Sequence, residues 1–368
     1  AALFVQQIGV KQASFPFLEL TGDPGAGKST LLRFLWRLIG RDNMEGIKPS
    51  GTGASAVGLS RAFAEASNLP VVLIESDRTY VDANGRTVTV QYAWDEVKTL
   101  YDYHAPLRVT GVRTTGNETR VNIWRGALAI SQNETVDGSE AILSRIVHLH
   151  CTTEHHSLAL KPLADRLKVM KAKELGGYLR KCLANEQQWL TRYFEAFPRY
   201  EQRLQSINAL TEGRIVQCHA QIMAAAYATQ ALFPDWTDRD TDSLAKHLEA
   251  RAIDRQQRCR SENPTAAKFW QIYHYLNEDV VTIIDADGER EEIRETLNHS
   301  IDKDLIGINI EHFQQACRKA GQDMIPDTQL RRALASSTTH RFIETRKARS
   351  RLEKRSLWLW FFSKRGEG

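Results

Sequence analysis

A complete Walker A loop, Gly22-Asp23-Pro24-Gly25-Ala26-Gly27-Lys28-Ser29, lies between a predicted strand over 15–20 and a predicted amphipathic helix over 30–39. Glycines in such a turn let backbone N–H groups approach phosphate oxygens, and the N-terminus of the helix favours negative charge. The pattern therefore predicts that Gly22 to Thr30 bind nucleotide phosphates, with Lys28 at the β- and γ-phosphates and the Ser29 hydroxyl on Mg²⁺. A glycine turn without a ligand is the alternative, and it leaves Lys28 and Ser29 unexplained.

Size and composition are those of a soluble globular protein with two or three domains. The chain has 368 residues, of which 42% are hydrophobic and 26% charged, and both fractions are ordinary. No apolar run is long enough to cross a bilayer, and no signal peptide is recognisable. The first residues, Ala1-Ala2-Leu3-Phe4-Val5, read like the inside of a helix. We therefore expect a cytoplasmic protein with no membrane partner, and a piece of a longer one.

Five cysteines occur at wide, irregular spacings, which favours free thiols in a reducing compartment. Histidines gather around Cys151, at positions 148, 150, 155 and 156. Alternate residues of a strand would present two of these ligands on one face, but no CxxC or HxxxH partner completes a zinc set. We favour a strand end followed by a polar loop over a metal site.

Basic residues concentrate at the end of the chain, although the net charge is only +4. The stretch 341–365 is rich in Arg and Lys and poor in acids, which favours a polyanionic partner. The predicted nucleic-acid contacts there are Arg346, Lys347 and Arg349. A solvated basic surface is the alternative.

The chain reads as three segments, which we take as domains over 1–156, 157–275 and 276–368. The first alternates apolar strands with helices and carries the P-loop, so it predicts an α/β fold. The second predicts helices over 175–197 and 213–232, with breaks at Pro198, Pro234 and Pro264. The third predicts two strands around Asp287-Gly288, helices over 310–320 and 327–336, and a basic two-stranded flap. That order is the winged-helix pattern.

Polar residues follow two strands of the first segment. The run Val71-Val72-Leu73-Ile74 leads into Glu75-Ser76-Asp77. A carboxylate at a strand tip beside a P-loop can hold Mg²⁺ through water or orient the attacking water. We assign Glu75 to the metal and Asp77 to water activation, with loop capping as the alternative.

The strand over 127–131 leads into Gln132-Asn133-Glu134. An amide at this tip is suited to hydrogen-bond the γ-phosphate and the attacking water, and we choose Asn133. Twelve residues on, Arg145 precedes another apolar run and is suited to project into a neighbouring subunit's site. There it would neutralise charge on the transferred phosphoryl group. A surface ion pair is the alternative for Arg145.

The order of these motifs resembles that of superfamily-three helicases, AAA+-type ring motors of viruses, phages and plasmids. The resemblance is carried by the P-loop, residues 71–77, a predicted hairpin over 107–123, residues 130–134 and residues 141–147. It looks closest to the ATPase module of primase–helicase proteins from phages and integrative elements. It covers the first 156 residues well, the C-terminal segment looks like the winged-helix domain that often follows such motors, and the middle helices carry no recognisable motif.

The resemblance implies a role for each matching residue. Lys28 and Ser29 match the Walker A lysine and hydroxyl, Asn133 the sensor asparagine and Arg145 the arginine finger. Glu75 and Asp77 match Walker B loosely, because Ser76 separates acidic residues that are usually adjacent. The hairpin over 107–123 is, in the family, a pore loop that grips DNA. This implies contacts by Arg113 at its tip and by Arg108 and Arg120 on its arms; a hairpin without a ligand is the alternative.

We therefore expect an ATP- and Mg²⁺-dependent DNA helicase or translocase module that acts in the replication of a mobile element. The resemblance implies a hexameric ring on single-stranded or forked DNA, with a primase domain upstream in the full-length protein. A DNA-bound NTPase switch or assembly factor without unwinding activity is the second reading, and Ser76 is its main support. A small-molecule P-loop kinase is disfavoured, because it gives the hairpin, Asn133 and Arg145 no role.

Overall fold

The computed structural model describes residues 1–42, 46–47, 56–74, 78–81, 87–90, 92, 94–111, 119–154, 156–285, 288–322 and 324–364. Packing divides the chain into two compact units. The first comprises Ala1–Asp137 and Ala141–Cys259, and the second comprises Arg260–Gly368 with the short segment Gly138–Glu140. The helices up to Cys259 therefore belong to the first compact unit, while the division into three domains at residues 156 and 275 stays a prediction.

The first unit is built on a parallel sheet with the strand order β2–β7–β1–β8. Ile47 extends the outer edge of β2 through one parallel bridge to Leu73. Strand β7 thus lies between the strand that leads into the P-loop and the strand that leads toward Glu75. The bounds are β1 (Phe17–Gly22), β2 (Ser67–Ile74), β7 (Arg125–Ser131) and β8 (Ile146–Cys151). The strands predicted from their apolar runs are confirmed.

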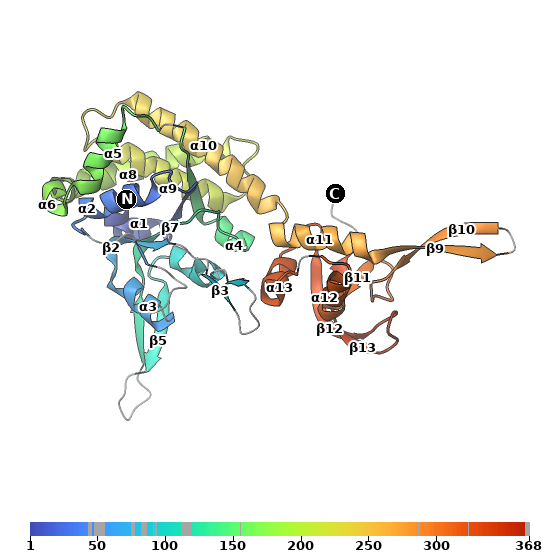
Figure 1. Ribbon diagram of the computed structural model, residues 1–368. Helices are drawn as coiled ribbons and strands as arrows, with labels where there is room; N and C mark the ends of the chain where they lie inside the picture. The colour runs from blue at the N-terminus through green and yellow to red at the C-terminus, as the bar shows by residue number, and fades with distance from the viewer. Residues whose placement is uncertain are drawn as a thin grey trace. The chain divides into compact units, whose positions relative to one another are not determined.

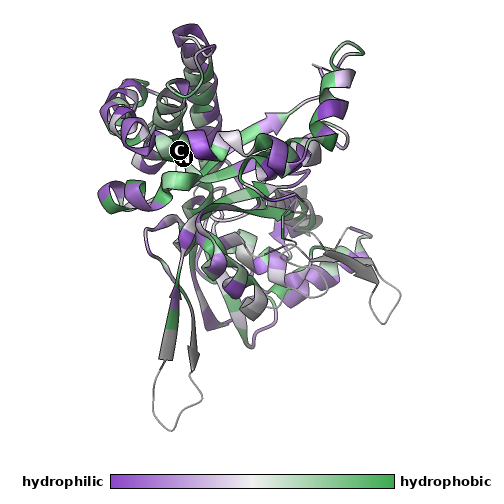
Figure 2. Cartoon of the chain, turned by 90° about the vertical axis from the view of Figure 1, so that its left-hand side faces the viewer, coloured by the Kyte–Doolittle hydropathy of each residue, from purple (hydrophilic) through white to green (hydrophobic). Residues whose placement is uncertain are grey.

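Helices cover both faces of this sheet, as a buried parallel sheet requires. On one face, Leu32 and Trp36 of α2 (Lys28–Leu38) pack against Leu20 and Val72. On the other face, α9 (Gly213–Gln230) and α10 (Asp238–Arg260) contribute to the main apolar core. Figure 1 shows α8, α9 and α10 on one side of β2 and β7, and the helices carry both hydrophobic and hydrophilic colouring in Figure 2, as elements with one buried face do. The remaining helices are η1 (Ala2–Phe4), α1 (Val5–Gln12), α3 (Ala56–Glu65), η2 (Trp94–Tyr101), α4 (Glu140–Leu143), α5 (Lys161–Val169), α6 (Ala172–Leu175), α7 (Gly177–Ala184) and α8 (Glu186–Gln205).

Two antiparallel hairpins complete the described strands of the first unit. The hairpin of β5 (Pro106–Gly111) and β6 (Thr119–Ile123) confirms the predicted one, and its tip, with Arg113, lies outside the described residues. The hairpin of β3 (Arg78–Val81) and β4 (Thr87–Val90) was not predicted. The sequence signal that could have predicted it is Asn84-Gly85, which lies between runs rich in β-branched residues.

The predicted break at Pro198 is wrong. Helix α8 continues through this proline to Gln205, and the break lies earlier, at Asn185 between α7 and α8. A proline inside a helix removes one hydrogen bond and crowds the preceding turn. Buried Trp189 and Tyr193 before it and buried Leu204 after it hold both halves of α8 against the core. Tertiary packing here outweighs the local cost of the proline.

The second unit packs three helices against a three-stranded antiparallel sheet with the order β11–β13–β12. Phe269, Trp270, Phe313, Leu330 and Phe362 form its core. A hairpin of β9 and β10 is inserted between α11 and β11, where two strands were predicted. The bounds are α11 (Pro264–Asn277), β9 (Glu278–Asp285), β10 (Gly288–Glu295), β11 (Leu305–Ile308), α12 (Ile310–Lys319), α13 (Asp327–Ala335), β12 (Phe342–Arg349) and β13 (Ser356–Ser363).

Candidate nucleotide-binding site

The P-loop joins the end of β1 to the start of α2, as predicted. Gly22, Gly25 and Gly27 have φ values of 145°, 87° and 90°, which only glycine adopts without strain. A Cβ on Gly22 would lie 2.1 Å from the carbonyl oxygen of Cys151, so the loop leaves the sheet tightly against β8. A Cβ on Gly25 or Gly27 would have no atom within 4 Å other than those of the adjacent residues in the chain. The start of the loop is therefore held against β8, while the part around Gly25 and Gly27 is open. Backbone N–H groups in this open part can donate to an anion.

Lys28 begins α2 and bends back over the loop. Its Nζ donates to the carbonyl oxygen of Gly22 and, at 3.1 Å, to that of Asp23. These bonds hold the ammonium group beside the loop. Ser29 and Asp23 are exposed, and Thr30 is half-buried. The first turn of α2 contains no acidic side chain that would compete for a phosphate.

The carboxyl-terminal ends of β1, β7 and β2 lie level with one another, at the end of the sheet where the P-loop begins. In the pairing register, Ser131 of β7 lies opposite both Leu20 of β1 and Ile74 of β2. The amide of Gln132 donates to the carbonyl oxygen of Leu20 at 3.2 Å, and Asn133 follows as an exposed residue. The segment that carries Asn133 is thus adjacent to the strand that carries the P-loop. Glu75 and Asp77 lie outside the described residues.

Arg145 lies immediately before β8, at the amino-terminal end of this strand and therefore at the end of the sheet away from the P-loop. Its guanidinium group donates to the carbonyl oxygen of Ala141, and its Cζ is 5.2 Å from the ring centroid of Tyr101. Burial, with the nearby charge of Arg214, lowers the pKa of Arg145. Since β8 spans the residues from Ile146 to Cys151, about 17 Å separates its two ends. Arg145 and the P-loop of its own chain therefore lie at opposite ends of β8.

A buried polar layer underlies the P-loop, and sequence reasoning missed most of it. Thr21, fully buried, bonds through Oγ1 to His148 Nε2 at 2.7 Å and to His150 Nδ1 at 2.9 Å. Glu19, two residues earlier on the same face of β1, pairs with Arg255 of α10. His148, His150 and Cys151 thus lie in strand β8, in agreement with the predicted strand end. Among the described residues, the one group with metal-ligand spacing is His299, His312 and Glu353, in the second unit.

Burial lowers the pKa of two histidines of the first unit, and this keeps both of them neutral at pH 7. It lowers the pKa of His219, on α9, from 6.5 to about 4, and that of His148 also to about 4. The unfolded chain therefore binds more protons than the folded chain between these values. The stability that these neutral histidines contribute is fully present above about pH 6.5 and is lost as the pH falls toward 4. For the fully buried His219 the loss amounts to roughly 3 kcal/mol.

We expect the urea midpoint of the full chain to fall between pH 7 and pH 5, and His219→Gln to make that fall shallower. Gln carries no titrating group, so the proton-linked part of the loss disappears. Denaturation followed by circular dichroism at several pH values measures it. His247→Gln, at an exposed position on α10, is the matched control and should behave as wild type. An equally steep fall in His219→Gln would show that this histidine does not govern the acid sensitivity.

The cationic residues predicted to contact nucleic acid divide into three groups. Arg113 lies outside the described residues, and for Arg108 and Arg120 only the backbone is described, in β5 and β6. In the second unit, Lys347 lies directly opposite Trp358 in the pairing of β12 with β13, and both are exposed.

Along the same face of this ribbon, Arg349 is exposed, and Trp358 exposes 65% of its surface. Arg346 is turned to the other face, over the ring of Phe361 at 4.7 Å, and pairs with Glu344. Cross-strand partners share a face of a ribbon, so Lys347, Arg349 and Trp358 form one exposed basic and aromatic strip.

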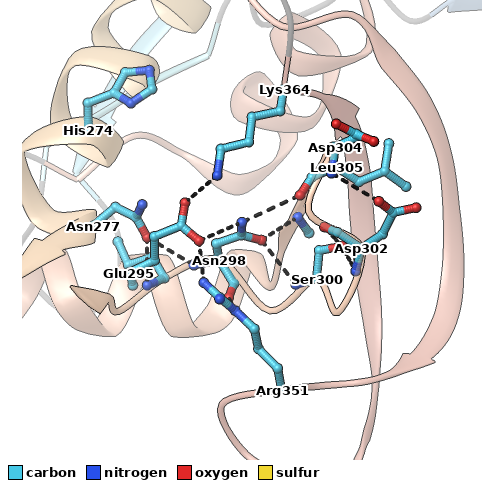
Figure 3. Close-up of polar contacts among 12 residues, drawn as sticks. His274, Asn277, Glu295, Asn298, Ser300, Asp302, Asp304, Leu305, Arg351 and Lys364 are labelled. Atoms are coloured by element: carbon cyan, nitrogen blue, oxygen red, sulfur yellow. Dashed lines mark hydrogen bonds and ion pairs between the residues drawn. The ribbon is translucent and has the colours of Figure 1, made fainter. Parts of the chain in front are cut away.

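Other cations of the basic C-terminal stretch are held within the second unit. Figure 3 shows Arg351 and Lys364 directed at the carboxylate of Glu295, with Lys364 Nζ at 2.8 Å. Arg351 Nε also donates to the carbonyl oxygen of Asn298 at 2.8 Å. These residues tie the turn between β12 and β13 and the end of β13 to the base of the β9–β10 hairpin. Part of the positive charge in 341–365 is therefore structural.

Comparison with known proteins adds little beyond the fold. No protein-family model and no curated protein matches the chain. Among solved structures the chain is similar to one described as SCCmec type IV Cch, an active helicase, with 11% identity and a TM-score of 0.49. The match covers 98% of this chain and 64% of that one, so this chain spans less than two thirds of its length. Among the described residues, no helix is both long and apolar enough to span a bilayer. The molecule has a mixed α/β fold with a parallel central sheet, compatible with a P-loop NTPase.

Proposed function

We propose that this chain is an ATP-hydrolysing DNA helicase or translocase module that acts in the replication of a mobile element. The observation that carries the proposal is the P-loop itself. Its glycines adopt φ values closed to other residues, its open part has space where a Cβ would stand, and Lys28 and Ser29 begin the helix behind it. This donor set fits the phosphates of a nucleoside triphosphate. Bound Mg²⁺ would neutralise charge between the β- and γ-phosphates, with Ser29 and Glu75 as its proposed protein partners.

The strand order supports a motor of the AAA+ type. Because β7 lies between β1 and β2, its tip brings Asn133 between the P-loop and the end of β2. An amide in that place is suited to hold the γ-phosphate and the attacking water. Ile47, beside β2, occupies the place of a further parallel strand. A small-molecule kinase needs no such intervening polar tip.

Arg145 supports hydrolysis at an interface between subunits. It lies at the end of β8 away from its own P-loop, and its half-buried guanidinium group would exchange the bond to Ala141 for a neighbour's nucleotide. We propose that like chains form a ring, with a hexamer as the expected size, in which Arg145 of each subunit completes the site of the next. Positive side chains of the β5–β6 hairpin would then face DNA in the channel.

The second unit supports binding of a polyanion. Apart from the inserted β9–β10 hairpin, its described elements run in the order α11, β11, α12, α13, β12 and β13, with the antiparallel pair β12 and β13 at the end. This is the order of a winged-helix domain. We propose that the strip of Lys347, Arg349 and Trp358 binds DNA, with the cations at phosphates and the indole against bases or sugars.

A nucleotide-dependent switch without unwinding is the second candidate. The sequence Glu75-Ser76-Asp77 separates two carboxylates that a fast ATPase of this type keeps adjacent. A slow hydrolase that changes its assembly state with nucleotide would tolerate this arrangement.

The deciding experiment is steady-state ATP hydrolysis with and without single-stranded DNA. We expect hydrolysis to require Mg²⁺ and to rise severalfold with DNA. The double variant Lys347→Ala/Arg349→Ala should lose most of its DNA affinity and flatten the salt dependence of binding by about 1.4 in log–log slope, for two phosphate contacts on a single strand. Lys319→Ala, an exposed cation on α12, is the control. A rate of ATP hydrolysis that does not change with DNA, together with no strand displacement, would favour the switch.

A further inference from the structure

A buried ion pair lies directly beneath the candidate nucleotide site. Glu19 of β1 and Arg255 of α10 are 0% and 1% exposed in their side chains, and Oε2 of Glu19 lies 2.7 Å from Nη2 of Arg255. Among the described residues, Nη1 of Arg255 is buried without an acceptor. Burying two charges is expensive, and an unmatched donor adds to the cost. Stability alone is therefore a poor explanation for this pair.

The same carboxylate holds the segment that carries Asn133. The amide of Val136 donates to Oε1 of Glu19, and the carbonyl oxygen of Val136 accepts from Arg258 Nη2 at 3.0 Å. The backbone N–H of Val136 is thus bonded to β1 and its carbonyl oxygen to α10, and its side chain is fully buried.

Four residues earlier, the amide of Gln132 donates to the carbonyl oxygen of Leu20, the residue next to Glu19. The short loop from Asn133 to Thr135 is consequently pinned at both ends to adjacent residues of β1. Two residues beyond Leu20, β1 becomes the P-loop. The position of Asn133 relative to the P-loop is therefore set through Glu19 and Leu20.

We propose that buried Glu19 and Arg255, together with half-buried Arg258, form a clamp that positions Asn133 to act at the terminal phosphate. This rests on the proposed function, since it assigns a duty during ATP hydrolysis. Glu19 and Arg255 touch no substrate and are positioning residues. Arg255 fixes the carboxylate, Glu19 and Arg258 fix Val136, and Val136 fixes the loop. The clamp also places α10 in direct contact with the one loop whose position must be exact for water attack.

Breaking the clamp should affect the chemical step more than nucleotide binding. The P-loop glycines, Lys28 and α2 do not depend on Val136, so KM for ATP should change less than threefold. A loop displaced by about 1 Å lowers the rate of a positioned reaction by up to about a hundredfold. We expect kcat to fall about ten- to a hundredfold.

The test variant is the double substitution Glu19→Met/Arg255→Met. Exchange of a buried ion pair for apolar side chains of similar volume is often neutral for folding, so this variant separates position from stability. It is compared with Asn133→Ala, with the triple variant, and with Arg203→Met/Glu249→Met. The last removes a partly exposed ion pair between α8 and α10 in the same unit, away from the loop, and should hydrolyse ATP as wild type does.

The measurements are kcat, KM and thermal midpoint for each protein. The proposal expects the triple variant to be no slower than Asn133→Ala, because residues that act through one group are not additive. A double variant with wild-type kcat, or losses that multiply in the triple variant, would overturn the clamp and leave the proposed function standing. A wild-type chain that neither binds nor hydrolyses ATP would overturn both.

Discussion

The Lys28→Ala variant is expected to hydrolyse ATP about 10²–10³-fold more slowly than the wild-type chain. Loss of one preorganised donor at developing charge has an effect of this size in other enzymes. In this chain the ammonium group of Lys28 is already held beside the loop by two carbonyl oxygens, those of Gly22 and Asp23. It needs only to exchange these bonds for phosphate oxygens. A colorimetric phosphate assay at saturating ATP measures the loss.

Binding should fail along with hydrolysis in this variant. At a nucleotide concentration of about a hundred times Kd, a ligand stabilises a protein by about 2.7 kcal/mol, which appears as a rise in the thermal midpoint. Wild type should show this rise and Lys28→Ala should show little of it. Arg33→Ala, which removes an exposed cation from the same helix, is the matched control. If Lys28→Ala kept most of its activity, the P-loop would not be the catalytic site.

Arg145→Ala is expected to reduce hydrolysis about 10³-fold in the assembled protein while leaving nucleotide binding intact. The side chain contacts Tyr101 and Ala141 at the end of the sheet away from its own P-loop. In the proposed ring its effect is therefore exerted on the neighbouring chain. Mixing Arg145→Ala with Lys28→Ala subunits should restore activity beyond the sum of the two parts, because the second supplies an intact arginine to the intact P-loop of the first.

A local structural role for Arg145 predicts a different result. Loss of its packing against Tyr101 would lower the thermal midpoint and would not be rescued by mixing. Arg214→Ala removes the neighbouring cation, which bonds Ser144 Oγ at 3.5 Å, and serves as the control. Strict additivity in the mixture, with a lowered midpoint, would identify Arg145 as part of the fold alone.

The sequence predicted well where local chemistry fixes local geometry. Glycines with positive φ, a lysine at the first position of α2 and apolar runs such as Val71–Ile74 each report on their own conformation, and the P-loop, β2 and the β5–β6 hairpin are where they were expected. The roles of Lys28, Asn133 and Arg145 stay predictions.

What escaped prediction depends on contacts between distant parts of the chain. Glu19 is a charged residue within an apolar strand, and its partner Arg255 is 236 residues away, so no local pattern joins them. Likewise, Pro198 carries a strong local preference that the packing of α8 overrides. The tail illustrates the same point, since counting its cations could not tell which of them Glu295 neutralises.

Strand β8 has a mechanical consequence for an assembly of such chains. One of its ends is pressed against Gly22 at Cys151, and before the other end the carbonyl oxygen of Arg145 accepts from the amide of Phe17 at 2.9 Å. Bonded to β1 along its whole length, β8 connects the base of the chain's own P-loop to Arg145, the arginine that we propose acts on the next chain. In the proposed ring, strain that a bound triphosphate puts on the P-loop would be transmitted along β8 to the site of the neighbouring chain. Sites linked in this way would turn over in succession around the circle, each one timed by the occupant of the last.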